Sequence, residues 1–175
     1  VIVLDRVNST DANYQKSWLL HSVNPPAIDQ NGNFVIPSPG ISNFNSSLAR
    51  IDNGEGRLFA KVLLPEESNI RVVGGPGYEF WVNGQNYPHN ADRVPDDETP
   101  GSWRIEVQPT LPRNNDLFLT VLYITDFSVP IMPPTNRIEA DTMVGTVIPG
   151  ITVLFSKSGD NVTKVKYEIT GNGIM

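Results

Sequence analysis

Apolar and polar residues alternate along several short segments of the chain, and this alternation predicts β-strands that are buried on one face. In one such segment Trp103, Ile105 and Val107 point inward between polar neighbours, and residues 164–169 repeat the pattern. One-sided burial of this kind is typical of antiparallel sheets. No window has a sustained apolar period of about 3.6 residues, so we expect little helix.

Glycine and proline separate these segments from one another. The 15 prolines and 14 glycines fall between short apolar runs, as they do in all-β domains. We therefore predict an antiparallel β-sandwich of about ten to twelve strands. The strands are expected near residues 1–7, 16–23, 34–37, 49–52, 57–64, 70–73, 78–82, 103–108, 117–125, 137–140, 151–157 and 163–170.

The 175 residues fit one main domain with a possible small addition. Residues 1–127 are the predicted sandwich core, and residues 128–136 are a proline-rich connection. Residues 137–175 are expected to complete or extend the sandwich with terminal strands. The polar segment 24–47 is predicted to be a long loop with one weak strand inside it.

Composition removes several classes of function. The chain has no cysteine, which excludes disulfides, thiolate metal sites and cysteine nucleophiles. Its net charge is −6 and it has no run of lysine or arginine, so we expect no nucleic-acid partner. No apolar run approaches the roughly 20 residues of a membrane helix, and we expect no membrane partner.

Three features of the sequence have a structural interpretation and a less favoured chemical one. Gly74–Gly77 is better explained by a tight turn than by a phosphate cradle, because an aromatic segment follows it instead of a helix. His21 and His89 are too far apart in sequence to indicate a zinc site, and His21 is expected to be half-buried. The acidic residues 92–98 lack calcium-loop spacing. We therefore predict no metal and no cofactor.

Tyr78, Phe80, Trp81 and Tyr87 lie close together in the sequence. Strand alternation places Tyr78 and Phe80 on the core face and Trp81 on the opposite face. Exposed aromatic rings can stack on the C–H faces of sugars. Trp81 and Tyr87 are therefore candidate carbohydrate-binding residues, with core burial as the competing interpretation.

The chain resembles the C-terminal β-domain of bacterial polysaccharide lyases of the heparinase II/III type. Four segments in the expected order carry the resemblance, and they cover about half of the chain: VLDRVNSTDANYQKSWLLHS (3–22), GEGRLFAKVLLPE (54–66), VGGPGYEFWVNGQNYP (73–88) and GSWRIEVQPTLPRNNDLFLTVLYITD (101–126). Residues 137–175 match only as generic strands.

The resemblance implies a bacterial protein that is secreted or periplasmic. Such enzymes cleave uronate-containing polysaccharides by β-elimination with residues of an N-terminal α/α toroid, and a further histidine comes from the start of the β region. The chain opens at Val1 on a strand pattern and has no histidine before His21. This suggests a fragment or a processed N-terminus. We expect no catalytic residue here and no lyase activity from the chain alone.

We therefore predict a non-catalytic domain that supports or binds an acidic polysaccharide beside an α/α-toroid catalytic domain. The alternatives are a stand-alone carbohydrate-binding module and a purely structural protein-interaction domain. Arg57, Lys61 and Arg104 lie on predicted strands with outward geometry and could contact the polysaccharide, although surface salt bridges are the commoner role of such residues. Arg104 joins Trp81 and Tyr87 as the candidate binding site.

Overall fold

The computed structural model describes residues 1–87 and 101–158 in full and residues 165–169 as backbone. Within these residues every regular element is a β-strand, there is no helix that could cross a membrane, and neighbouring strands run antiparallel. The all-β antiparallel prediction is confirmed. The expectations for His89, the acidic residues 92–98 and the side chains of 164–169 concern positions outside the described set.

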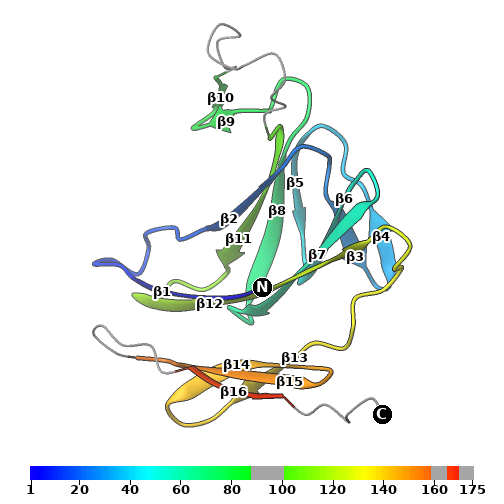
Figure 1. Ribbon diagram of the computed structural model, residues 1–175. Coiled ribbons are helices and arrows are strands. Elements are labelled where there is room, and N and C mark those ends of the chain that lie inside the picture. The colour runs from blue at the N-terminus through cyan, green and yellow to red at the C-terminus, as the bar shows by residue number, and fades with distance from the viewer. Residues whose placement is uncertain (88–100, 159–164, 170–175) are drawn as a thin grey trace, which may run out of the picture.

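Two sheets face each other and form a sandwich (Figure 1). The larger sheet has six strands in the order β1 (Ile2–Asn8), β12 (Asn115–Asp126), β7 (Gly56–Leu64), β6 (Leu48–Asn53), β3 (Ala27–Gln30) and β4 (Asn33–Val35). The smaller sheet has four strands in the order β2 (Trp18–Ser22), β11 (Trp103–Pro109), β8 (Ser68–Gly74) and β5 (Gly40–Phe44).

Two further sheets lie outside the sandwich. A two-stranded hairpin of β9 (Trp81–Val82) and β10 (Gln85–Asn86) projects beyond one end of the four-stranded sheet (Figure 1). The terminal sheet has the order β13 (Asn136–Glu139), β14 (Met143–Ile148), β15 (Ile151–Ser156) and β16 (Val165–Ile169).

The main core lies between the two sandwich sheets and uses the alternate apolar residues that the sequence pattern predicts. Trp103, Ile105 and Val107 of β11 are buried in it, and Trp18 of β2 packs against it. Val62 of β7 belongs to the same cluster from the opposite sheet. Burying one large apolar side chain contributes roughly 1.5–3 kcal/mol, so this cluster dominates the stability of the sandwich.

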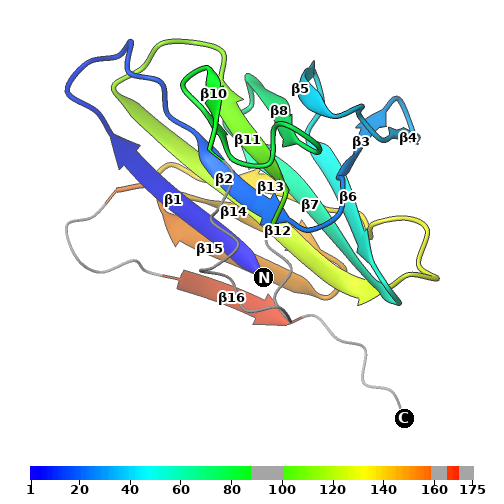
Figure 2. The same cartoon turned by 90° about the horizontal axis from the view of Figure 1, so that it is seen from above.

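A second apolar cluster lies on the other face of the six-stranded sheet. Phe59 of β7 and Val121 of β12 meet Met132 there, which comes from the connection between β12 and β13 (residues 127–135). The terminal sheet lies along the same side, beneath β1 and β12 (Figures 1 and 2), and Val144 and Thr146 of β14 are buried. β7 and β12 therefore have both faces covered.

The segment 24–47 is more regular than the sequence predicted. It contains β3, β4 and β5, where one weak strand was expected. Each is only three to five residues long, and β4 and β5 are edge strands. β5 buries Phe44 against the core but leaves Ile41 exposed. Short edge strands have too few core positions to produce a clear alternation, so tertiary pairing decides their conformation.

The glycine cluster forms the predicted turn at the end of β8. Gly75 and Gly77 have φ values of 79° and 84°, which L-residues with side chains rarely adopt. A Cβ on Gly75 would lie 2.7 Å from Cζ2 of the buried Trp103 ring. The turn therefore requires glycine for conformation and for space, and it leads the chain into the projecting hairpin.

Candidate functional site

The flap is the name used here for residues 75–87, which contain the hairpin of β9 and β10. The predicted strand over residues 78–82 was wrong for its first three residues, because a turn occupies them. Asn83 and Gly84 connect the two strands with φ values of 49° and 84°. Two successive positive φ values characterise the tight turns that close two-residue hairpins. The backbone N–H of Tyr87 donates to the carbonyl of Phe80 at 3.2 Å.

The carboxylate of Glu79 organises the interior of the flap. It accepts the backbone N–H of Gly77 at 3.0 Å and the side-chain amide of Asn86 at 3.0 Å. The oxygen of the same Asn86 amide accepts the N–H of Phe80 at 2.9 Å. Backbone N–H groups, first that of Glu79 itself, together with Asn86 lower the pKa of the Glu79 carboxyl below its ordinary value. The flap conformation therefore favours an ionised Glu79.

Two aromatic rings of the flap pack on each other. The ring centroids of Tyr78 and Trp81 are 4.7 Å apart with an interplanar angle of 34°, and both side chains are half-buried. The expected separation of Tyr78 and Trp81 onto opposite faces was wrong, because residues 78–80 turn instead of extending. Tyr87 is 55% exposed at the end of the flap. Of the described flap rings, Tyr87 is the one that presents most of its surface to solvent.

Arg104 joins the flap to the outer face of the four-stranded sheet. Its Nη2 donates to the carbonyl oxygen of Trp81 at 2.6 Å, and its Nε donates to Oε1 of Glu106 at 2.6 Å. The structure thus brings together two of the three residues that the sequence analysis named for binding. Arg104 thereby fixes the backbone at Trp81, and 13% of its side-chain surface remains accessible.

Glu106 is shared by two arginines. Arg71 of β8 donates from Nη1 to Oε2 at 2.7 Å, and Gln108 donates to the same oxygen at 3.0 Å. Glu106 is only 6% exposed, so these donors replace the water that its charge would otherwise require. The arginine platform, defined as Arg71, Arg104 and Glu106, carries one net positive charge on a chain of net charge −6.

Sequence reasoning missed Arg71 and Glu106 as members of this site. Both lie at outward positions of their strands, and Glu106 is directly opposite Arg71 in the β11–β8 register. The alternation identifies their face, but 35 residues separate them in the sequence. Only the pairing of β8 with β11 reveals the cluster.

Apolar and imidazole side chains flank the arginine platform. His21 and Leu19 of β2 lie opposite Arg104 and Glu106 in the register, and both are exposed. The expectation that His21 is half-buried was therefore wrong. His21 is on the outer face of the sheet, because Trp18 and Leu20 occupy the inward positions of β2.

Arg57 is not available as the surface contact that its strand position suggested. It is 6% exposed and forms two hydrogen bonds with Asp52, from Nε at 2.6 Å and from Nη2 at 3.0 Å. Its Nη1 donates to the carbonyl of Val129 in the connection at 2.7 Å. The hydrogen bonds to Asp52 raise the pKa of the guanidinium further, so it remains charged. The connection covers this position, which the sequence pattern of β7 alone does not reveal.

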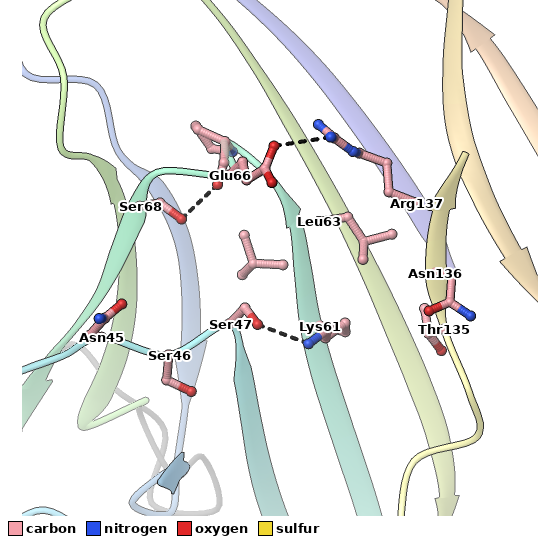
Figure 3. Close-up of a pocket in the computed structure, with 12 residues that line it drawn as sticks. Asn45, Ser46, Ser47, Lys61, Leu63, Glu66, Ser68, Thr135, Asn136 and Arg137 are labelled. Carbon is pink, nitrogen blue, oxygen red and sulfur yellow. Dashed lines mark hydrogen bonds and ion pairs between the residues drawn. The ribbon is translucent and has the colours of Figure 1, made fainter. Parts of the chain in front are cut away.

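Lys61 lies at a polar pocket of about 450 Å³ between the sandwich and the start of the terminal sheet (Figure 3). Its Nζ donates to Oγ of Ser47 at 2.8 Å. On the opposite wall Arg137 pairs with Glu66 at 3.0 Å. This seam pocket is on the far side of the sandwich from the arginine platform, since β7 presents Lys61 on its outer face.

The comparisons with known proteins give no assignment: no family model matches the chain, and no curated protein matches it. Among the described residues, no three histidine, aspartate or glutamate side chains gather as metal ligands would. The candidate binding surfaces are therefore the arginine platform, the flap and the seam pocket.

Proposed function

We propose that this chain is a non-catalytic β-domain that binds an acidic, uronate-containing polysaccharide across the arginine platform and the flap. The observation that carries the proposal is the double role of Arg104. It pairs with a buried carboxylate on the sheet, and it holds the backbone of Trp81 beside that sheet. A cation and aromatic rings are thereby fixed next to each other.

Charge supports an anionic ligand. The net charge of the chain is −6 and disfavours polyanions, whereas the arginine platform has two guanidinium groups for one carboxylate. Guanidinium groups match carboxylate and sulfate geometry with paired N–H donors.

Aromatic surface supports a sugar chain as the carrier of that charge. Trp81 is braced by Tyr78, and Tyr87 is largely exposed at the end of the same flap. A braced ring loses little conformational entropy when a ligand stacks on it. The resemblance to heparinase II/III-type lyases points in the same direction, and the chain would then serve as a supporting or substrate-holding domain of such an enzyme.

A second candidate function is protein interaction through the same face. Leu19 and Ile41 are 49% and 40% exposed on the outer positions of β2 and β5, on either side of the arginine platform. Apolar residues around a central arginine pair are also found at domain interfaces. In that case the face packs against a catalytic domain and has no affinity for free polysaccharide.

Affinity electrophoresis distinguishes the two functions. The chain is run through native gels that contain heparin, chondroitin sulfate, alginate or a neutral glucan. We expect retardation by an acidic polymer, weakening as salt is added, and none by the neutral glucan. Trp81→Ala and Arg104→Ala should each remove most of the retardation.

Arg113→Ala is the matched control, because it removes the same charge from an exposed arginine beyond the other end of β11. It should migrate like the parent chain after correction for its charge. Equal mobility of the parent chain in all four gels would reject polysaccharide binding and favour the protein-interaction function.

A further inference from the structure

The seam pocket is open to solvent and is lined by three parts of the chain that are distant in sequence. The loop between β5 and β6 supplies Asn45–Ser47, β7 and the turn after it supply Lys61–Ser68, and the start of the terminal sheet supplies Thr135–Arg137. Figure 3 shows these three segments around a common space, with Leu63 between the polar side chains. Its volume of about 450 Å³ lies within the roughly 300–1,000 Å³ that is usual for small-ligand pockets.

The lining is rich in neutral hydrogen-bonding groups. Three serines, one threonine and two asparagines contribute hydroxyl and amide groups: Ser46, Ser47, Ser68, Thr135, Asn45 and Asn136. Each of these groups can donate and accept hydrogen bonds. Ser68 and Thr135 already donate to the carbonyls of Pro65 and Pro133 at 2.8 Å, and their oxygens can still accept hydrogen bonds from a ligand that carries several hydroxyl groups.

The pocket also has one unbalanced positive charge. Lys61 and Arg137 line it together with a single carboxylate, Glu66. Arg137 pairs with Glu66 at 3.0 Å and lies 3.6 Å from Glu139, while Lys61 donates to the neutral hydroxyl of Ser47. An ammonium group has three N–H donors, so Lys61 has donors for a ligand anion beside that contact.

We propose that the seam pocket binds a small, hydroxyl-rich molecule that carries one carboxylate, such as a single uronic acid unit. Lys61 pairs with the carboxylate, the serine, threonine and asparagine side chains bind the hydroxyl groups, and Leu63 contacts the C–H face of the ring. This site is separate from the polysaccharide surface proposed above, because the two lie on opposite sides of the sandwich.

Binding there connects two layers of the protein. Thr135–Arg137 belong to the connection and the terminal sheet, whereas Lys61 and Ser47 belong to the sandwich. A ligand that contacts both walls favours the docked arrangement of the terminal sheet. Since a ligand stabilises the state that binds it, the melting temperature should rise with ligand concentration.

The test is an NMR titration of the ¹⁵N-labelled chain with sodium glucuronate, glucose and sodium acetate. We expect saturable shifts with glucuronate and at least about tenfold weaker binding of glucose, which lacks the charge, and of acetate, which lacks the hydroxyl groups. Equal shifts with glucuronate and acetate would mean a nonspecific anion effect and would overturn the proposal. So would the absence of saturable shifts with glucuronate.

Variants locate the site. Lys61→Met should weaken glucuronate binding about tenfold, and Asn136→Ala, at an exposed position of the other wall, should weaken it severalfold without touching the sandwich. Arg113→Met is the control, because it removes one positive charge outside the lining and should leave the affinity unchanged. If Lys61→Met is poorly folded, Asn136→Ala decides alone, and an unchanged affinity in that variant overturns the proposal.

The two proposals can fail independently. Lys61→Met should leave gel retardation by acidic polymers intact, and Arg104→Ala should leave the glucuronate titration intact. Loss of both properties in either variant would mean that one site, and not two, accounts for anion binding, and it would reject the assignment of the seam pocket.

Discussion

Arg57 and Arg104 each contact a carboxylate at 2.6 Å, on opposite outer faces of the sandwich, but their surroundings differ. Arg57 donates to Asp52 and Val129, and its guanidinium carbon lies 4.5 Å from the centre of the Phe127 ring. The connection covers it, and Arg57 is only 6% exposed. Arg104 shares its carboxylate with Arg71, and the side chains of the two arginines are 13% and 28% exposed.

The difference shows how one pairing chemistry can serve two purposes. Around Arg57 the donors are used within the protein, so this cluster fastens the connection to the six-stranded sheet. Around Glu106 there are two cations for one anion, so the arginine platform retains a charge that a ligand can neutralise. Asp52 is likewise shared by Arg57 and Arg50, so the covering connection distinguishes the two clusters, whereas their stoichiometry and shortest contact distances are the same.

The largest effect is expected when the covered cluster is broken. Arg57→Met removes the hydrogen bonds to Asp52 and to the Val129 carbonyl and leaves Asp52 with Arg50 at 3.3 Å. Because the guanidinium is buried, we expect a loss of about 3 kcal/mol in the free energy of unfolding, measured by urea denaturation. A loss below about 1 kcal/mol would contradict the fastening role. Polysaccharide retardation of the folded fraction should not change.

Neutralising Asp52 and Glu106 should distinguish the Arg57 cluster from the arginine platform more clearly. Asp52→Asn and Glu106→Gln keep side-chain size, and each should cost about 1–2 kcal/mol of stability through weakened charge-assisted hydrogen bonds. Glu106→Gln also raises the positive charge of the open face, so its retardation by acidic polymers should increase. Asp52→Asn also removes one negative charge, but in the cluster that the connection covers. Its retardation should therefore increase only as much as the change in net charge of the whole chain predicts.

Acid should loosen the flap. The pKa of Glu79 is lowered in the folded chain, so its contribution to flap order is complete above its ordinary pKa of about 4.3 and is lost as pH falls through the lower folded value. We expect a change in Trp81 fluorescence in that range. It should be absent in Trp81→Phe, and Glu79→Gln should lack the acid transition. A transition of equal size in Glu79→Gln would assign it to another group.

The smallest effect is expected at a solvent-exposed ion pair that contains one arginine and one carboxylate. Arg113 and Glu67 meet at 3.0 Å with side chains that are 45% and 52% exposed. Arg113→Ala should change the free energy of unfolding by less than about 1 kcal/mol in urea, because solvent screens such pairs. A larger loss would mean that exposure is a poor guide to the energetics of the other two clusters.

The inward residues of β11 were predictable because the relevant pattern is local. Trp103, Ile105 and Val107 alternate with polar residues within one strand, and all three side chains lie in the sandwich core. The glycine turn after β8 was predictable for a similar reason, since the chain geometry at Gly75 and Gly77 depends on the residues themselves.

The binding candidates were only partly predictable. The contact of Arg104 with Trp81 follows from the path of the flap, where a turn replaces the extended residues that the sequence indicated. The burial of Glu106 depends on the register between β11 and β8, and that of Arg57 on a connection that returns 72 residues later. Long-range pairing of this kind leaves no local pattern.

The cover on both faces of β7 has a consequence for how the protein opens. β7 is hydrogen-bonded between β12 and β6, with the main core on one face and the Phe59 cluster on the other. The central backbone amides of β7 become accessible to solvent only when the sheets on both of its faces separate. The amides of the flap can exchange without this separation. In hydrogen–deuterium exchange, the slowest amides should therefore lie in β7, and their rate should report unfolding of the whole sandwich.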